Sequence, residues 1–212
     1  FMFMGGALAL LLRVELFSPG VQLIADSMTY NRIFTVHGTT LIFLFILPSA
    51  SAFGNYLVPI MVRFKDMAYP KLNAVAFWMI PPAGALIWLG FADFTWYAYP
   101  TYSVVSAPGP AADMWIFGLK ILGVSSILGS INFVVTIMKC KHPDLPLSKM
   151  PLLAWAYLTS SLTGVRGLIP GVSDALIQIN QNNIPFPHME FRNSHTFLFL
   201  EKLSQLLYLM LY

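Results

Sequence analysis

The sequence predicts an all-α integral membrane protein, a bundle of about five transmembrane helices. Its 212 residues are 57% hydrophobic and only 10% charged, whereas a soluble domain carries about 25% charged residues. Several apolar segments also reach the ~20 residues that a helix needs to cross a bilayer. With a mean hydropathy of +0.69, the chain is too apolar to cover an ordinary water-facing surface.

Five apolar segments are the expected helices, at residues 1–17, 33–61, 72–92, 114–138 and from 151 onward. In the first, Gly5 and Gly6 are small enough for close helix contact, and Ser18-Pro19-Gly20 ends the segment. Pro81-Pro82 is expected to kink the third segment, because proline removes a backbone donor and clashes with the preceding turn.

The loop charges predict one consistent orientation. Two loops carry only acidic charges, with Asp26 in the first and Asp93 and Asp113 in the third. The other two loops hold the basic residues Arg63, Lys65, Lys71, Lys139, Lys141 and Lys149. The positive-inside rule places these two basic loops in the cytoplasm or matrix.

Other classes are excluded by composition. No basic run suggests a nucleic-acid partner. The single cysteine, Cys140, forms no internal disulfide and no cysteine metal cluster. The chain begins inside an apolar stretch without a charged leader, which indicates a fragment boundary rather than a signal peptide.

His37 is the first candidate functional residue, because it lies in the apolar segment that follows Arg32. One alternative is a hydrogen bond to a neighbouring helix. The other is a role as ligand of a metal ion or a haem iron, since neutral imidazole commonly binds metal ions and haem iron. Gly38 beside it leaves room for a flat macrocycle. Arg13 is expected at a similar depth, with His37 ~5–8 Å inside the outer end of its helix. Arg13 has alternative partners in Glu15 and lipid headgroups.

A second set of polar residues is expected in the inner half of the membrane. Such side chains either bond neighbouring helices or hold a line of ordered water, and a carboxylate at the mouth of such a line collects protons. The set consists of Asn55, Asp66, Asn73, Ser125, Ser126 and Asn132.

Residues 1–160 resemble helices one to five of subunit I of the haem–copper terminal oxidases, the cytochrome c oxidase type. Ordered blocks at the family's spacing carry the resemblance. They include Leu12-Arg13-Val14-Glu15-Leu16, Thr35-Val36-His37-Gly38-Thr39, Gly54-Asn55-Tyr56-Leu57-Val58-Pro59, Asp66-Met67-Ala68-Tyr69-Pro70, Leu72-Asn73, Phe77-Trp78, Trp96 with Tyr99-Pro100, and Gly123-Val124-Ser125-Ser126-Ile127-Leu128-Gly129 with Ile131-Asn132-Phe133.

The resemblance implies a role for each matched residue. His37 matches an axial histidine of the low-spin haem, whose iron it binds, and Arg13 matches the arginine at that haem's peripheral group. Trp96 and Tyr99 fall near the haem propionates. Asp66 matches the carboxylate at the mouth of the D proton pathway, and the pathway lining is matched by Asn55, Asn73, Ser125, Ser126 and Asn132. Lys120 stands where the family usually has histidine.

The resemblance also implies the activity and its partners. Family members reduce dioxygen to water and pump protons, using a low-spin haem of a or b type, a high-spin haem and copper B. Expected partners are subunits II and III, membrane lipids, and either cytochrome c or quinol as electron donor. The expected location is a prokaryotic plasma membrane, with the mitochondrial inner membrane as the alternative. The related nitric oxide reductases fit less well, because they lack the D-pathway residues.

Residues 161–212 are expected to be a divergent tail that arose from a frameshift, a misjoined sequence read or an intron remnant. Its histidines, His188 and His195, are expected to be exposed loop residues. The copper ligands, the high-spin haem ligand and the second axial histidine would lie on later helices of the family's twelve-helix fold. The chain alone is therefore expected to be inactive. The competing hypotheses are a truncated helical membrane protein without haem and a small transporter.

Overall fold

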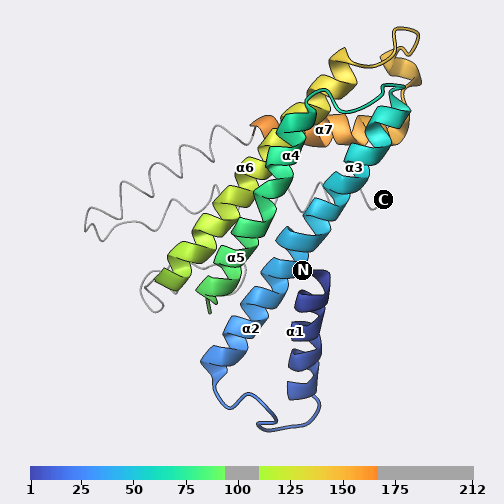
Figure 1. Ribbon diagram of the computed structural model, residues 1–212. Coiled ribbons are helices and arrows are strands. Elements are labelled where there is room, and N and C mark those ends of the chain that lie inside the picture. Colours follow the sequence, from blue (N-terminus) through green and yellow to red (C-terminus); the bar gives the residue numbers. More distant parts are fainter. Residues whose placement is uncertain (94–109, 167–212) are drawn as a thin grey trace. The chain divides into compact units, whose positions relative to one another are not determined.

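The computed structural model describes residues 1–93 and 110–166, whose regular elements are all helices, with no strand among these residues (Figure 1). The elements are α1 Met2–Glu15, α2 Ser27–Thr39, the π-helix η1 Thr40–Ile46, α3 Leu47–Met61, α4 Pro70–Trp78, α5 Ile80–Gly90, α6 Pro110–Lys139, the 3₁₀-helix η3 Leu147–Lys149 and α7 Leu152–Arg166.

Three helical stretches are long and apolar enough to cross a membrane: Ser27–Met61, Pro70–Gly90 and Pro110–Lys139. The predicted all-α membrane class is confirmed. The first and fifth predicted segments are also helical, as α1 and α7, with described lengths of 14 and 15 residues.

The second predicted segment starts earlier than expected, at Ser27 instead of residue 33. Asp26 caps this helix, because its carboxylate accepts the backbone N–H groups of Met28 at 3.2 Å and Thr29 at 3.0 Å. Polar residues therefore form the first turns of α2, and hydropathy alone does not mark them as helical.

The expected interruption at Pro81-Pro82 is present. Helix α4 ends at Trp78 and α5 begins at Ile80, with the prolines in the first turn of α5. Proline is tolerated there because first-turn N–H groups have no partner within the helix.

The chain forms two compact units, and the divisions between them fall inside α3, α4 and α6. The first unit holds residues 1–54 and 74–125, and the second holds residues 55–73 and 126 onward. In the first unit, a core cluster of Leu44, Ile87, Ala92, Ala112 and Trp115 joins η1, α5 and α6.

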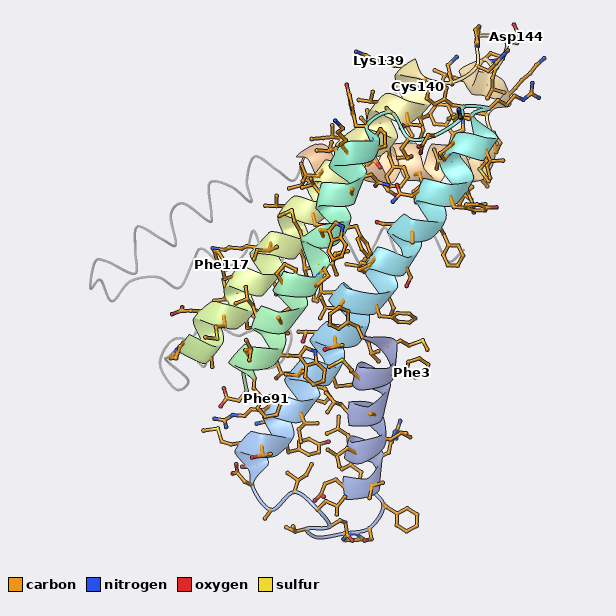
Figure 2. The ribbon with its side chains drawn as sticks, viewed as in Figure 1. Phe3, Phe91, Phe117, Lys139, Cys140 and Asp144 are labelled. Carbon is orange, nitrogen blue, oxygen red and sulfur yellow. The ribbon has the colours of Figure 1, made fainter. Side chains whose placement is uncertain are left out.

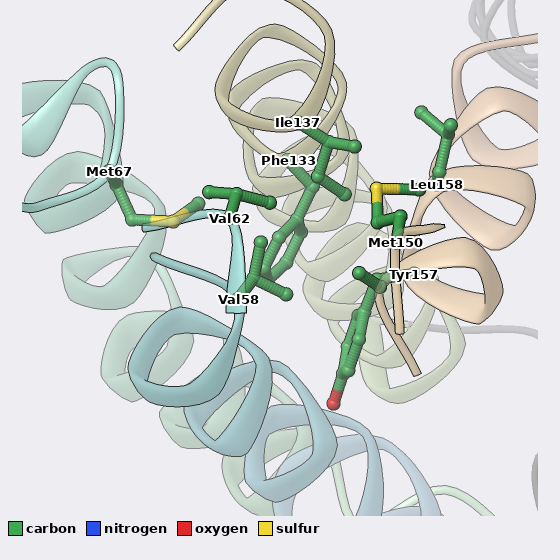
Figure 3. Close-up of a cluster of buried hydrophobic side chains, with 9 residues drawn as sticks. Val58, Val62, Met67, Phe133, Ile137, Met150, Tyr157 and Leu158 are labelled. Atoms are coloured by element: carbon green, nitrogen blue, oxygen red, sulfur yellow. The ribbon is translucent and has the colours of Figure 1, made fainter. Parts of the chain in front are cut away.

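In the second unit, the C-terminal ends of α3 and α6 pack with α7 (Figure 3). The buried cluster there consists of Val58, Val62, Met67, Phe133, Ile137, Met150, Ala154, Tyr157 and Leu158. The Phe133 and Tyr157 rings stack with centroids 5.1 Å apart. The backbone N–H of His142 donates to the carbonyl of Val62 at 3.0 Å, so the two basic loops are joined.

Large apolar side chains lie on the outside of the helices. Figure 2 shows Phe3 on α1 and Phe117 on α6, whose exposed fractions are 83% and 59%. An apolar exterior of this kind suits a hydrocarbon surrounding.

Candidate functional site

The imidazole of His37 is fixed by a bond to a neighbouring helix in the first unit. Its Nδ1 atom lies 2.9 Å from the carbonyl oxygen of Gly5 on α1. A carbonyl oxygen only accepts, so Nδ1 carries the proton in a neutral ring and Nε2 keeps its lone pair. The two sequence alternatives are therefore compatible, because the ring bonds a helix with one nitrogen and keeps the other for a ligand.

Gly5 is the contact that brings α1 close to His37. A Cβ at Gly5 would lie 2.7 Å from Cδ2 of Leu41 and 3.3 Å from Cγ2 of Thr40. At Gly38 and Gly6 an added Cβ would meet no described atom within 4 Å. Of the two small residues singled out in the first segment, Gly5 is the packed one, and the space beside Gly38 is open.

The expectation that Arg13 and His37 lie at similar depth is wrong. Helix α2 begins at Ser27, so His37 lies ten residues along it, ~15 Å from its start. His37 is level with Gly5, and Arg13 lies eight residues further along α1, ~12 Å toward its end. The early helix start at the Asp26 cap accounts for the difference.

Glu15 does not pair with Arg13. Its carboxylate accepts the backbone N–H groups of Gln22, Leu23 and Ile24 at 3.2, 2.7 and 2.9 Å. These bonds fold the loop after α1 back onto the helix end. In the second basic loop, an ion pair joins His142 Nδ1 to Asp144 Oδ2 at 3.4 Å.

In the second unit, α6 side chains bond the loop that contains Asp66. Asn132 is fully buried. Its Oδ1 accepts the N–H of Tyr69 at 2.9 Å, and its Nδ2 donates to the Tyr69 carbonyl at 3.2 Å. Thr136, also fully buried, accepts the N–H of Ala68 at 2.9 Å. Thr136 was not among the predicted site residues, although it lies one turn after Asn132 on the same helix face.

The Asp66 side chain is exposed in this loop, and its Oδ1 accepts the N–H of Met67 at 2.7 Å. The Oδ1 atom of Asn55 on α3 is buried and has no hydrogen-bond partner among the described residues. Asn73, in α4, is half-buried. The structure therefore brings Asp66 and Asn132 together through the loop backbone.

The two serines of the predicted proton path fall on opposite sides of the division in α6. Ser125, in the first unit, is buried and donates to the Ala76 carbonyl at 2.6 Å. Ser126 is exposed. Trp96 and Tyr99, like most of the predicted tail, lie outside the described residues. Within residues 1–93 and 110–166, no three His, Cys, Asp or Glu side chains are grouped to hold a metal ion.

Comparison with known proteins identifies the family. The family described as "Cytochrome C and Quinol oxidase polypeptide I" matches residues 1–199. This chain belongs to that family. The predicted family membership is confirmed. The match continues past residue 160 to residue 199, and the domain boundary at residue 161 stays a prediction.

Curated relatives carry the same family name. Cytochrome c oxidase subunit 1 of Synechocystis sp. is 46% identical over 165 residues, which cover 76% of this chain and 30% of the relative. That of Thermostichus vulcanus is 46% identical over 167 residues, with the same coverage. The cytochrome c oxidase polypeptide 1 of Halobacterium salinarum is 40% identical over 164 residues, covering 74% of this chain and 27% of the relative. The chain spans about 30% of the length of the first two relatives.

Proposed function

We propose that this chain is part of a proton-pumping respiratory terminal oxidase that reduces dioxygen to water. The observation that carries the proposal is the bond from His37 Nδ1 to the Gly5 carbonyl, which leaves Nε2 available to an iron. Metal-binding histidines commonly donate their other ring nitrogen to a carbonyl or carboxylate, which fixes the ring and raises its basicity.

The residues around His37 fit a low-spin haem of a or b type, which supplies one-electron transfer when bound. His37 would be its axial ligand, and the open space beside Gly38 suits a flat ring. Arg13 would interact with the haem's peripheral group. Side chains tilt toward the start of their helix, so the long Arg13 side chain covers part of its ~12 Å offset from the level of His37. Trp96 and Tyr99 are proposed near the propionates.

We further propose that the chain supplies the cytoplasmic half of a D-type proton pathway. Asp66 would collect protons at the exposed end. The buried, unpartnered Oδ1 of Asn55 supports an ordered water inside. The remaining residues of the pathway would be Asn73, Ser125, Ser126 and Asn132.

The whole oxidase would add a high-spin haem, copper B and the partner subunits II and III, with cytochrome c or quinol as electron donor. Bacterial and archaeal relatives support a prokaryotic plasma membrane as the location.

The test uses the complex purified from native membranes by a tag on this chain. Reduced-minus-oxidised spectra are recorded for the wild type, His37→Leu and the control His142→Gln, which replaces an exposed loop imidazole. We expect the low-spin haem band in the wild type and the control and its loss in His37→Leu. The chain expressed alone should give little or no bis-histidine signal, because the second axial ligand is expected from outside it.

A wild-type complex without haem would contradict the proposal and favour the non-catalytic membrane protein. The proton path is tested separately with Asp66→Asn, which keeps the side-chain shape and removes the charge. Proton uptake by the reconstituted complex should slow by about tenfold or more, since proton transfer by a positioned group contributes roughly 10²–10⁴-fold.

A further inference from the structure

Two buried side chains of α6 hold the backbone that follows Asp66. Asn132 uses its carbonyl oxygen and its amino group on the same residue, Tyr69, at 2.9 and 3.2 Å. Thr136 accepts from the N–H of Ala68 at 2.9 Å, and its hydroxyl donates to the Asn132 carbonyl at 2.7 Å. The threonine therefore satisfies the loop and its own helix with a single oxygen.

We propose that Thr136, together with Asn132, is a positioning residue that fixes the carboxylate of Asp66. This inference rests on the proposed role of Asp66 in proton uptake. Asp66 is exposed, and its one bond to described protein atoms is to the N–H of Met67, at 2.7 Å. The direction of the carboxylate therefore depends on the orientation of the Met67 peptide.

Three successive residues link that peptide to α6. The Met67 side chain is buried in the cluster that includes Ile137, and Ala68 and Tyr69 are bonded to Thr136 and Asn132. Without these contacts each loop residue would sample several backbone conformations. With these contacts in place, the hydroxyl of Thr136 acts on Asp66 through two peptide units, without touching it.

The same geometry defines the role of Asn132. Both ends of its carboxamide bond Tyr69, so Asn132 holds the loop. Asn55, with its buried unpartnered Oδ1, is the residue better placed to bind water.

The first experiment uses the isotope-labelled full chain in lipid nanodiscs. Thr136→Val keeps the branched shape and removes the hydroxyl, whereas Thr136→Ser keeps the hydroxyl. In Thr136→Val we expect the Ala68 amide to exchange about tenfold faster or more, since a lost buried hydrogen bond is of that order. The Met67 amide resonance should also move toward its position in Asp66→Ala. Thr136→Ser should retain both wild-type values.

Wild-type exchange at Ala68 and an unmoved Met67 resonance in Thr136→Val would overturn the proposal. If that variant does not accumulate in membranes, Thr136→Ala, which removes the hydroxyl with less bulk, is judged by the same two measurements.

The second experiment measures proton uptake by the purified complex. We expect Thr136→Val to slow uptake severalfold and Thr136→Ser to restore it. Faster Ala68 exchange with unchanged uptake would overturn the positioning role, because the bond would then serve the fold alone. Unchanged uptake in Asp66→Asn would instead overturn the proposed function, and the exchange result would still report whether the loop is held.

Discussion

The Nδ1 atom of His37 lies 2.9 Å from the carbonyl oxygen of Gly5, and this bond joins α2 to α1. A Cβ at the same glycine would lie 2.7 Å from Cδ2 of Leu41, so a side chain there fits only if Leu41 or α1 shifts. Helix contact and imidazole orientation therefore depend on one residue. A neighbouring small residue, Gly6, has no such restriction.

Gly5→Ala should push α1 and α2 apart at His37. Overpacking of this kind costs about 1–3 kcal/mol, so the free energy of unfolding in mixed micelles should fall by about that amount. Gly6→Ala is the matched control, with open space at its Cβ and a helix-propensity gain of about 1 kcal/mol. Equal stability of the two variants would show that the close contact at Gly5 is absent.

Glu15→Gln should release the loop after α1. The carboxylate accepts three backbone N–H groups, and a carboxamide has only one accepting oxygen. Oε1 accepts from Gln22, whereas a glutamine oxygen in the place of Oε2 can still accept from Leu23 and Ile24. The amide of Gln22 should therefore exchange with solvent about tenfold faster, measured by mass spectrometry of the chain in nanodiscs. Arg13→Gln, at the same helix end, should leave this amide unchanged. Unchanged exchange in Glu15→Gln would contradict the clamping role.

Lowering the pH should loosen the first turn of α2. The hydroxyl of Thr29 and the N–H groups of Thr29 and Met28 bond the Asp26 carboxylate and hold its pKa below its ordinary value. A lowered folded-state pKa gives stability that is complete above the unfolded-state pKa and is lost as the pH falls through the folded-state value. The protection factors of Met28 and Thr29 should therefore stay constant near neutrality and fall in the acid range.

Asp26→Asn is the control for this titration. Asparagine caps a helix about as well as aspartate and carries no charge. Its protection factors should show no acid transition, and an identical transition in both proteins would assign it to another group.

The apolar segments were predictable because twenty apolar residues in a row have few alternatives to a membrane helix. Their ends were less predictable. Residues 27–32, most of them polar, extend α2 ahead of the apolar stretch, so His37 lies further from the helix start than expected. The cap at Asp26 was a readable signal in the sequence.

The π-helix Thr40–Ile46 had no sequence signal, because hydrophobic residues pack equally in either helix type. It is defined by bonds such as that from the Leu47 N–H to the carbonyl of Ile42, five residues earlier. The partners of Asn132 were likewise beyond the sequence. Its position on a face shared with Ser125 was readable, but the Tyr69 backbone that it bonds lies 63 residues away.

Gly118→Ala should weaken the packing of α6 on α5. A Cβ at Gly118 would lie 2.8 Å from Cγ1 of Ile87 and 2.9 Å from the backbone oxygen of Ala83. The isoleucine can adjust its side chain, but the carbonyl belongs to a helix and moves only if α5 moves. Small residues are what allow membrane helices to approach this closely. We expect a loss of about 1–3 kcal/mol in unfolding free energy, as for other overpacked sites.

Gly123→Ala on the same helix is the control, since its Cβ would meet no described atom within 4 Å. It should be neutral or stabilising by up to about 1 kcal/mol, from helix propensity alone. Both variants gain the same propensity, so the difference between their unfolding free energies isolates the contact with α5. A difference near zero would mean that α5 and α6 separate easily, and that Gly118 does not determine their spacing.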